Sequence, residues 1–311
     1  MTRRSRGGFS KPGRAADTVR AGRPVVLKLG GELLETAQRT QAVGSALAGL
    51  QGGGPLVVVH GGGKEIDSAL ARAGMAKRQV DGLRITDEAT LDIVVSVLAG
   101  LVNTRLVAAV SAAGGDGVGL TGADAAIGLV HKAEPHAAAD GTTVDLGRVG
   151  IPVEARPPQL LVELCRRGYI PIVATIGMSR SGELYNVNAD TFAAHLAGAL
   201  GAHRLVIAGG TAGVLDGRGQ TIRTLDPAAV DHLINAGTAT AGMIAKLSAC
   251  RDALALGVRE VFIANGHDLA GIRDLVRQGA RTGMAGCTQV VNQEGLGLRA
   301  QGFRPHARVS A

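Results

Sequence analysis

The chain repeats one local pattern, in which a short run of β-branched and aliphatic residues ends at glycine and opens into a helix-forming stretch. Continuous apolar strands that alternate with helices are typical of a mainly parallel sheet covered on both faces. The sequence therefore predicts an α/β fold, a three-layer αβα sandwich around a mainly parallel central sheet. The runs lie at Val25–Leu29, Leu56–Val59, Ile170–Ile176, Leu205–Ala208 and Val261–Ala264.

The glycines lie where such a sheet binds its ligands. Clusters such as Gly30-Gly31, Gly61-Gly62-Gly63 and Gly209-Gly210 follow the runs, and the 311 residues contain 47 glycines. Ligands of open α/β sheets bind beyond the carboxyl ends of the strands, and glycine allows a ligand to approach the backbone closely. Residues 117 to 149 depart from the pattern and predict hairpins or edge strands.

The net charge of +7 does not indicate a nucleic-acid partner, because residues 1 to 24 alone carry +6. The remaining chain lacks the clustered positive charge that binding to a phosphate backbone requires. Aromatic residues make up 2% of the chain, and Trp is missing, which argues against a base-stacking platform. We therefore expect no nucleic-acid partner, and we predict that residues 1–24 form a basic flexible arm.

Two further expectations concern location. Charged residues, Asn or Gly interrupt every apolar run, including the one from Leu91 to Val110, so we expect no membrane partner. Three cysteines that lie far apart fit reduced thiols better than a disulfide framework. These features predict a cytoplasmic protein.

The segment His60-Gly61-Gly62-Gly63-Lys64 follows an apolar run and precedes a helical pattern. Bare N–H groups at a helix N-terminus suit an anion. A Walker-type nucleotide loop is excluded because Glu65 stands where Ser or Thr should follow Gly-Lys. An esterase oxyanion loop would need a Gly-x-Ser-x-Gly elbow, and this chain has none. A phosphate cradle and a plain strand-to-helix turn both remain open.

Three charged residues lie in settings where charge is costly. Lys28 stands inside an apolar run, where an ammonium group needs an anion beside it. Lys246 lies in an apolar stretch near the expected start of a helix, and a lysine on the solvent-exposed face of that helix would fit the same sequence. Asp190 closes the run Asn186-Val187-Asn188-Ala189-Asp190, which suits both a nearby ligand and simple helix capping.

Taken in order, six motifs resemble those of the amino acid kinase family, and within it those of the members that phosphorylate N-acetyl-L-glutamate. The resemblance extends from Val25 to about Val291. It implies the amino acid kinase fold with two lobes, residues 25–200 binding the acyl amino acid and 201–296 binding ATP, followed by a tail at 297–311. The motifs are Lys28–Gly31, His60–Gly63, Asp81–Thr86, Tyr185–Asp190, Gly213–Asp216 and Gly242–Lys246.

The resemblance implies transfer of the γ-phosphoryl group of ATP, which carries Mg²⁺, to the side-chain carboxylate of N-acetyl-L-glutamate in arginine biosynthesis. A carboxylate with a pKa of about 4.3 is ionised at neutral pH, so the reaction needs no general base. Alignment and charge neutralisation must supply the catalysis. The family also implies a homodimer, or a hexamer built as a trimer of dimers.

The resemblance also assigns roles to individual residues. Lys28 and Lys246 would stabilise the transferring phosphoryl group, and Asp190 would hold the two ammonium groups in position. Backbone N–H groups of Gly30, Gly31, Gly62 and Gly63 would bind the phosphates or the acceptor. No residue of the protein is expected to bind a metal, because the Mg²⁺ arrives with ATP. The substrate-binding residues would be Gly62, Gly63, Arg84 and Asn186, and the nucleotide-binding residues Gly30, Gly31, Gly209, Gly210, Gly213, Leu215, Gly242 and Met243.

One departure from the family pattern lies on the nucleotide side, where Gly210 replaces the usual aspartate. Two alternatives stay open beside the main hypothesis, and this change points only to the second of them. The chain could phosphorylate a related acyl amino acid, such as N-succinylglutamate or a carrier-linked aminoadipate. It could also be a non-catalytic sensor of an amino acid or nucleotide, although a sensor has no need for Lys28, Asp190 and Lys246 together.

Overall fold

The computed structural model describes residues 22–138, 140–153, 157–235, 241–279 and 286–291. The basic arm predicted at residues 1–24 lies outside this part except for residues 22–24. The tail predicted at 297–311 lies outside it entirely.

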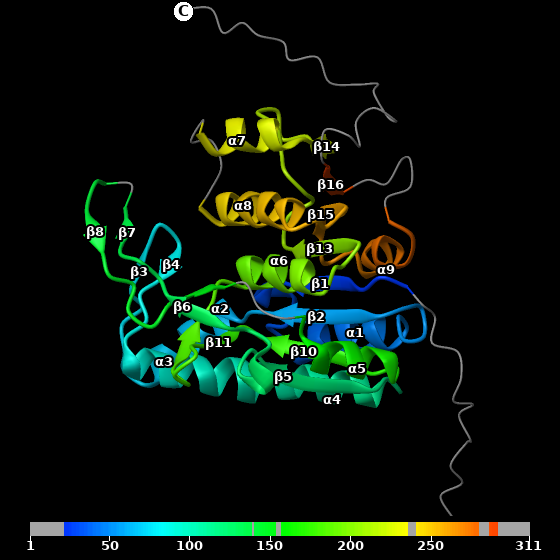
Figure 1. The fold of residues 1–311 in the computed structure, drawn as a ribbon, viewed down its shortest axis with the longest axis horizontal. Helices are drawn as coiled ribbons and strands as arrows, with labels where there is room; N and C mark the ends of the chain where they lie inside the picture. Colours follow the sequence, from blue (N-terminus) through cyan, green and yellow to red (C-terminus); the bar gives the residue numbers. More distant parts are fainter. Residues whose placement is uncertain (1–21, 139, 154–156, 236–240, 280–285, 292–311) are drawn as a thin grey trace, which may run out of the picture.

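An eight-stranded sheet forms the middle of the molecule (Figure 1). Its neighbouring strands run parallel except for β15 and β16, which are antiparallel. The predicted α/β class with a mainly parallel sheet is therefore confirmed. From edge to edge the strands are β14 (Thr224–Leu225), β16 (Cys287–Val290), β15 (Glu260–Asn265), β13 (Arg204–Gly209), β1 (Val25–Leu29), β2 (Leu56–His60), β10 (Ile170–Ala174) and β5 (Gly117–Thr121).

Helices cover both faces of this sheet, which gives the three layers that the sequence predicts (Figure 1). The first face is covered by α1 (Ala37–Ala48), α2 (Gly63–Arg72), α3 (Glu88–Val95), the π-helical segment η2 (Ser96–Val102), α4 (Asn103–Ala112) and α9 (Leu269–Gln278). The second face is covered by α5 (Gln159–Arg166), α6 (Ala189–Ala199), α7 (Pro227–Asn235) and α8 (Ala241–Ala255). The short 3₁₀ helices are η1 (Gly31–Leu33) and η3 (Asp124–Ala126).

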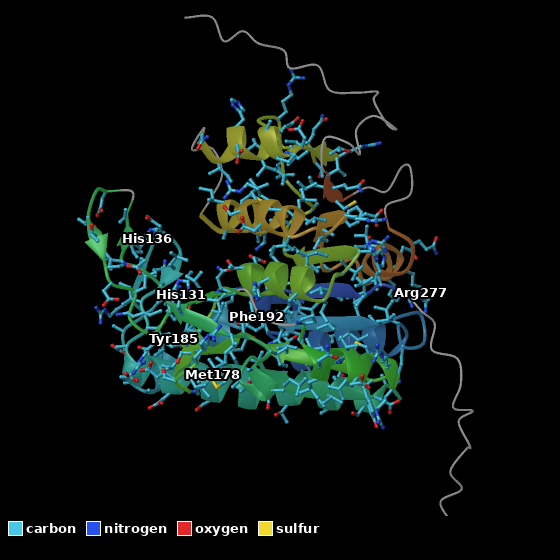
Figure 2. The ribbon with its side chains drawn as sticks, viewed as in Figure 1. His131, His136, Met178, Tyr185, Phe192 and Arg277 are labelled. Atoms are coloured by element: carbon cyan, nitrogen blue, oxygen red, sulfur yellow. The ribbon has the colours of Figure 1, made fainter. Side chains whose placement is uncertain are left out.

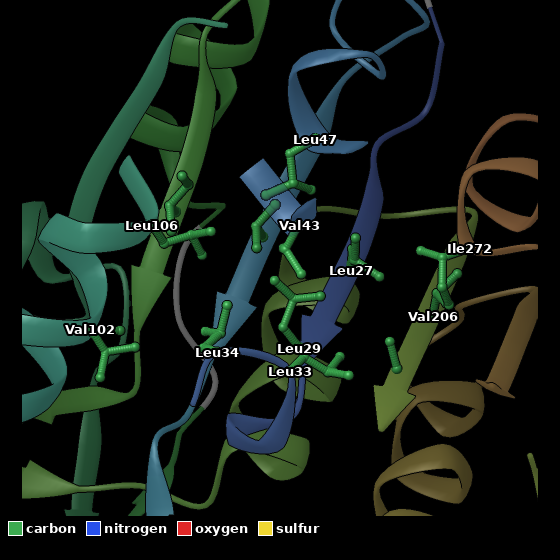
Figure 3. Close-up of a cluster of buried hydrophobic side chains, with 14 of the residues drawn as sticks. Leu27, Leu29, Leu33, Leu34, Val43, Leu47, Val102, Leu106, Val206 and Ile272 are labelled. Carbon is green, nitrogen blue, oxygen red and sulfur yellow. The ribbon is translucent and has the colours of Figure 1, made fainter. Parts of the chain in front are cut away.

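The alternation of side chains along β1 divides the core into two halves. Leu27 and Leu29 pack on the first face against residues of α1, α4 and α9, as Figure 3 shows. Val26 lies in the other cluster, with residues of α6 and α8. Because successive side chains of a strand point to opposite faces, Lys28 is placed on the same side as Val26. Strand β1 thus directs one charged residue toward α6.

Four small antiparallel pairs of strands lie outside the main sheet. Figure 1 shows β3–β4 and β7–β8 projecting at one end of the molecule. They are linked by a hydrogen bond of 2.8 Å between His136 and Asp81, and His136 is labelled in Figure 2. Hairpins and an edge strand, β5, thus occupy residues 117 to 149 as the sequence predicts. The pairs are β3 (Gln79–Val80) with β4 (Leu83–Arg84), β6 (Val130–Lys132) with β9 (Gly150–Pro152), β7 (His136–Ala137) with β8 (Thr143–Val144), and β11 (Ile176–Met178) with β12 (Leu184–Asn186).

The prediction of one strand over Ile170–Ile176 is wrong for its last two residues. Strand β10 ends at Ala174, and the chain leaves the main sheet at Thr175. Ile176 then begins β11, where it pairs with Asn186 of β12. This break brings the Asn-Val-Asn-Ala-Asp run back to the carboxyl end of the sheet.

The apolar stretch from Leu91 to Val110 continues as helix through the polar residues that interrupt its sequence. Segments α3, η2 and α4 form one helix, Glu88–Ala112, which is long and apolar enough to cross a bilayer. Core helices of soluble proteins meet the same criterion. One stripe of this helix, including Val94, Leu98 and Leu106, is buried in the core of the first face. The fold therefore accounts for that stripe without a membrane.

Helices α1 and α4 approach each other at Gly44. A Cβ atom added there would lie 2.6 Å from the Cβ and carbonyl carbon of Ala109, closer than atoms can pack. We expect Gly44→Ala to lower the free energy of unfolding by about 1–3 kcal/mol, because overpacking outweighs the gain in helix propensity. Urea unfolding followed by circular dichroism measures this.

Gly100→Ala is the matched control, because a Cβ atom on Gly100 would meet nothing within 4 Å. This substitution should raise stability by about 0.5–1 kcal/mol, the usual gain from replacing a helical glycine. Equal effects of the two substitutions would contradict the close approach of α1 and α4.

Candidate active site

Lys28 lies on the central strand of the sheet, with β13 on one side and β2 on the other. It is only 5% exposed, although it carries a charge. An isolated ammonium group would be costly at this depth. The sequence motif at residue 190 supplies its partner from the neighbouring helix.

Asn188 caps the N-terminus of helix α6. The side chain of Asn188 accepts hydrogen bonds from the N–H groups of Asp190 and Thr191, which fixes Asp190 in the first turn. One carboxylate oxygen of Asp190 lies 2.7 Å from Nζ of Lys28, and the other accepts a hydrogen bond of 3.1 Å from Nζ of Lys246 on α8. The structure thus brings the three predicted catalytic residues into direct contact.

Electrostatics keep Asp190 ionised in this position. Burial by itself would raise its pKa, but the ammonium groups of Lys28 and Lys246 offset that effect and hold the pKa below its usual value. The trio has a formal charge of +1. It therefore presents net positive charge at the carboxyl end of the sheet, where an anion would bind.

The glycine turns after β1 and β2 touch backbone to backbone. A Cβ atom on Gly31 would lie 3.1 Å from Cα of Gly62 and 3.2 Å from the nitrogen of Gly63. Gly62 in turn packs on η2, since its Cβ would lie 2.9 Å from Leu98. These glycines therefore allow the two turns to form one continuous surface of backbone.

One predicted donor is wrong. The N–H group of Gly30 donates a hydrogen bond of 2.8 Å to the carbonyl oxygen of Ala208, which continues the pairing of β1 with β13. That N–H is already used and cannot also bind a phosphate. Glycine is needed at position 30 for another reason. A Cβ atom there would lie 2.5 Å from the carboxylate oxygens of Glu32, which is too close.

His60, at the end of β2, is fully buried, and burial lowers its pKa to about 4. One ring nitrogen lies 3.0 Å from the carbonyl oxygen of Gly61, and the other lies 3.0 Å from the side-chain amide of Asn103 on α4. The same amide donates to the carbonyl oxygen of Ile172. A neutral, enclosed imidazole with these partners anchors the glycine turn.

Arg84 and Asn186 come from different hairpins and lie near the same end of the sheet. Arg84, on β4, forms an ion pair with Asp67 of α2 and donates to the carbonyl oxygen of Gly63 at 3.3 Å. Its Nη1 atom is buried and has no hydrogen-bond partner among the described residues. Asn186 donates to Oγ1 of Thr86, two residues beyond Arg84, at 3.2 Å. An additional carboxylate would satisfy the unpaired nitrogen of Arg84.

Apart from Gly30 and Gly31, the residues predicted to bind the nucleotide form two groups. Gly209 ends β13 and Gly210 follows it, beside Lys246, whose Cε atom would lie 3.5 Å from a Cβ on Gly209. Gly242 and Met243 open α8, one helical turn before Lys246. The remaining two predicted residues lie in the loop after β13, where Gly213 has a φ of 93° and packs on Thr288, and Leu215 is 49% exposed.

The sequence-based prediction missed the acidic side chains around these turns. Glu32 accepts a hydrogen bond of 2.6 Å from the N–H of Gly210, and Glu35 pairs with Lys64 at 2.7 Å. Asp67 holds Arg84, and Glu65 lies at the start of α2, where burial raises its pKa. The sequence contains a signal for two of them. Glu32 and Glu65 lie one or two residues after the glycine clusters at which an anion is expected, and an acidic side chain so close to an expected anion site is unusual.

Comparison with known proteins identifies related chains. The family model described as the amino acid kinase family matches residues 23–265. A protein named acetylglutamate kinase from Sphingopyxis alaskensis is 41% identical over 254 residues, which cover 79% of this chain and 83% of that protein. One of the same name from Methanopyrus kandleri is 40% identical over 243 residues, 77% of this chain and 94% of that protein.

A solved structure shares the fold. It is N-acetylglutamate synthase from Neisseria gonorrhoeae, complexed with coenzyme A and N-acetyl-glutamate, and its TM-score is 0.72 at 25% sequence identity. The match covers 87% of this chain and 59% of the synthase chain.

Loss of the central carboxylate should destabilise the protein. In Asp190→Asn the buried ammonium group of Lys28 and the partly buried one of Lys246 lose their counter-charge, and we expect the free energy of unfolding at pH 7 to fall by about 3–5 kcal/mol. Folding lowers the pKa of Asp190. Its contribution to the free energy of unfolding is therefore fully present above the pKa of the unfolded state, about 3.9, and is lost as the pH falls through the pKa of the folded state. The difference from wild type should shrink in acid, as measured by urea unfolding.

Asp231→Asn is the control for that measurement. Asp231 pairs with Arg251 at 3.0 Å, but both side chains are about half exposed, so the loss should be about 0–1 kcal/mol. A similar small loss for Asp190→Asn would contradict a buried carboxylate that holds Lys28 and Lys246.

Proposed function

The chain belongs to the amino acid kinase family, and on this premise we propose that it phosphorylates the side-chain carboxylate of N-acetyl-L-glutamate with ATP. The product is the acyl phosphate N-acetyl-L-glutamyl 5-phosphate, made in arginine biosynthesis. The names of its relatives support this activity. The observation that carries the proposal is the contact of Lys28 and Lys246 with opposite oxygens of Asp190.

The acceptor brings its own nucleophile to the reaction. Its side-chain carboxylate is ionised at neutral pH, so no residue has to remove a proton. This agrees with the surroundings of His60, which is buried, neutral and bonded to Gly61 and Asn103. Catalysis then depends on holding two anions in line and compensating their repulsion.

Lys28 and Lys246 compensate that repulsion. Lys28 comes from β1, the strand of the predicted lobe 25–200 that borders β13 of the predicted lobe 201–296, and Lys246 comes from the nucleotide side. Asp190 sets their separation and keeps them from moving apart in the absence of phosphate. Mg²⁺ would arrive with ATP as part of the substrate and would neutralise charge on its phosphates. The backbone of Gly31, Gly62 and Gly63 leaves room for the transferring group between these charges.

The acceptor would be held by its remaining polar groups. The α-carboxylate would pair with the guanidinium of Arg84, which has an unpaired buried nitrogen. Asn186 would hydrogen-bond the acylamino group. Thr86 links these two residues through the hydrogen bond from Asn186, so both recognition groups are positioned together.

The other hypotheses are less well supported. A sensor would not need two ammonium groups on one buried carboxylate, and relatives over most of the chain are named as kinases. Phosphorylation of N-succinylglutamate or a carrier-linked aminoadipate would require a different acyl pocket at the same site. Assembly as a homodimer or trimer of dimers, and a cytoplasmic location, remain predictions from the resemblance and the sequence.

The activity is tested by trapping the acyl phosphate with hydroxylamine. With Mg²⁺, ATP and N-acetyl-L-glutamate, we expect a coloured hydroxamate that forms only with enzyme and exceeds the yield with N-succinylglutamate. Lys246→Met should lower turnover by about 10²–10³-fold through loss of charge stabilisation. Hydroxamate no higher than in the enzyme-free control would favour the sensor, and a higher yield with N-succinylglutamate would change the acceptor.

Arg84→Lys tests recognition of the acceptor. A lysine cannot make the forked contact of a guanidinium, so we expect KM for N-acetyl-L-glutamate to rise roughly 10- to 150-fold, equivalent to about 1.5–3 kcal/mol. The KM for ATP should change little. Arg78→Lys is the control, since Arg78 is exposed and pairs with Asp87 at 3.6 Å. An unchanged acceptor KM in Arg84→Lys would remove Arg84 from the site.

A further inference from the structure

The carboxylate of Glu32 lies between the glycine turns that follow β1 and β13. Its Oε1 atom accepts a hydrogen bond of 2.6 Å from the N–H of Gly210. A Cβ atom on Gly30 would lie 2.5 Å from both carboxylate oxygens, and one on Gly209 would lie 3.2 Å from Oε1. Glycines on both turns are therefore what makes space for this acidic group.

The other acids nearby are already paired with cations. Asp190 holds Lys28 and Lys246, and Glu35 pairs with Lys64. Glu32 forms no ion pair within the described part of the chain, and its backbone carbonyl, not its carboxylate, accepts from Arg39. A carboxylate placed where ATP should bind would repel the phosphates unless a cation came with them.

We propose that Glu32 binds the Mg²⁺ of the Mg²⁺–nucleotide complex, directly or through a water molecule. This inference rests on the proposed function. Mg²⁺ prefers oxygen ligands and is usually held by one or two carboxylates together with substrate phosphates. The described residues contain no group of three His, Cys, Asp or Glu side chains that could hold a metal by themselves. One carboxylate at this place supplies what a nucleotide-borne cation needs.

The position of Glu32 also bears on the residue that replaces the family aspartate. A Cβ atom on Gly210 would lie 3.6 Å from Cγ and from Oε1 of Glu32. A side chain at position 210 would start beside the place that the Glu32 carboxylate fills. Glu32 thus supplies, from the turn after β1, an acidic group close to where residue 210 would otherwise carry one.

A role of Glu32 in excluding the nucleotide, instead of binding Mg²⁺, would change the nucleotide affinity of a Glu32 variant in the opposite direction. If Glu32 only occupied the N–H of Gly210 in place of a phosphate, its carboxylate would have to leave when the nucleotide binds. Neutralising it would then strengthen nucleotide binding whether or not Mg²⁺ is present. The Mg²⁺ dependence of binding therefore separates the two roles.

Isothermal titration of the full chain with ADP, with and without Mg²⁺, tests the proposal. Wild type should bind Mg²⁺–ADP more tightly than free ADP. Glu32→Gln keeps an oxygen acceptor for Gly210, and we expect it to bind Mg²⁺–ADP about 10- to 100-fold more weakly. Its affinity for free ADP should be unchanged or higher, because a negative charge is removed. Glu32→Ala, checked for an unchanged melting temperature, should show the same loss.

Glu35→Gln is the matched control, an acid three residues away whose partner is Lys64, and it should keep the wild-type gain from Mg²⁺. A Glu32→Gln variant that binds Mg²⁺–ADP as tightly as wild type would overturn the proposal, and so would a wild type without any gain from Mg²⁺. A wild type that binds no ADP in either form would instead contradict the proposed function.

Discussion

One buried carboxylate shared by two ammonium groups is the interaction on which the rest of the site depends. Asp190 compensates the charge of Lys28, which is buried, and the charge of Lys246, which is partly buried. Strand β1, the cap of α6 and the packing of α8 on α6 are all needed to bring these groups together. The surrounding sheet and helices can therefore be understood as the support for one set of charges.

Much of this arrangement follows from local rules that can be applied to the sequence. Alternation along β1 places Lys28 on a defined face, and Asn188 fixes where α6 begins. Contacts between distant turns do not follow from such rules. Neither the hydrogen bond from Gly210 to Glu32 nor the pairing of Arg84 with Asp67 leaves a periodic signal, because each depends on how separate strands are juxtaposed.

The wrong predictions have physical causes of the same kind. The break after Ala174 is invisible in an apolar run, because β11 is as apolar as β10 and only its pairing with β12 differs. The N–H of Gly30 is free in the sequence pattern, because the register of β1 with β13 leaves no sign there. The helix Glu88–Ala112 combines an apolar composition with isolated polar residues, one of which, Asn103, holds His60 in the interior.

The acid that contacts the end of β13 comes from a turn 178 residues earlier in the chain. A family pattern is compared one position at a time, and at position 210 it would register only that glycine stands where the resemblance implies an aspartate. Judged by that position alone, the chain would be taken to lack an acidic group, although the carboxylate of Glu32 lies beside it. Spatial superposition of chemical groups is the safer criterion for separating pseudoenzymes from enzymes in which a functional group has migrated to another strand.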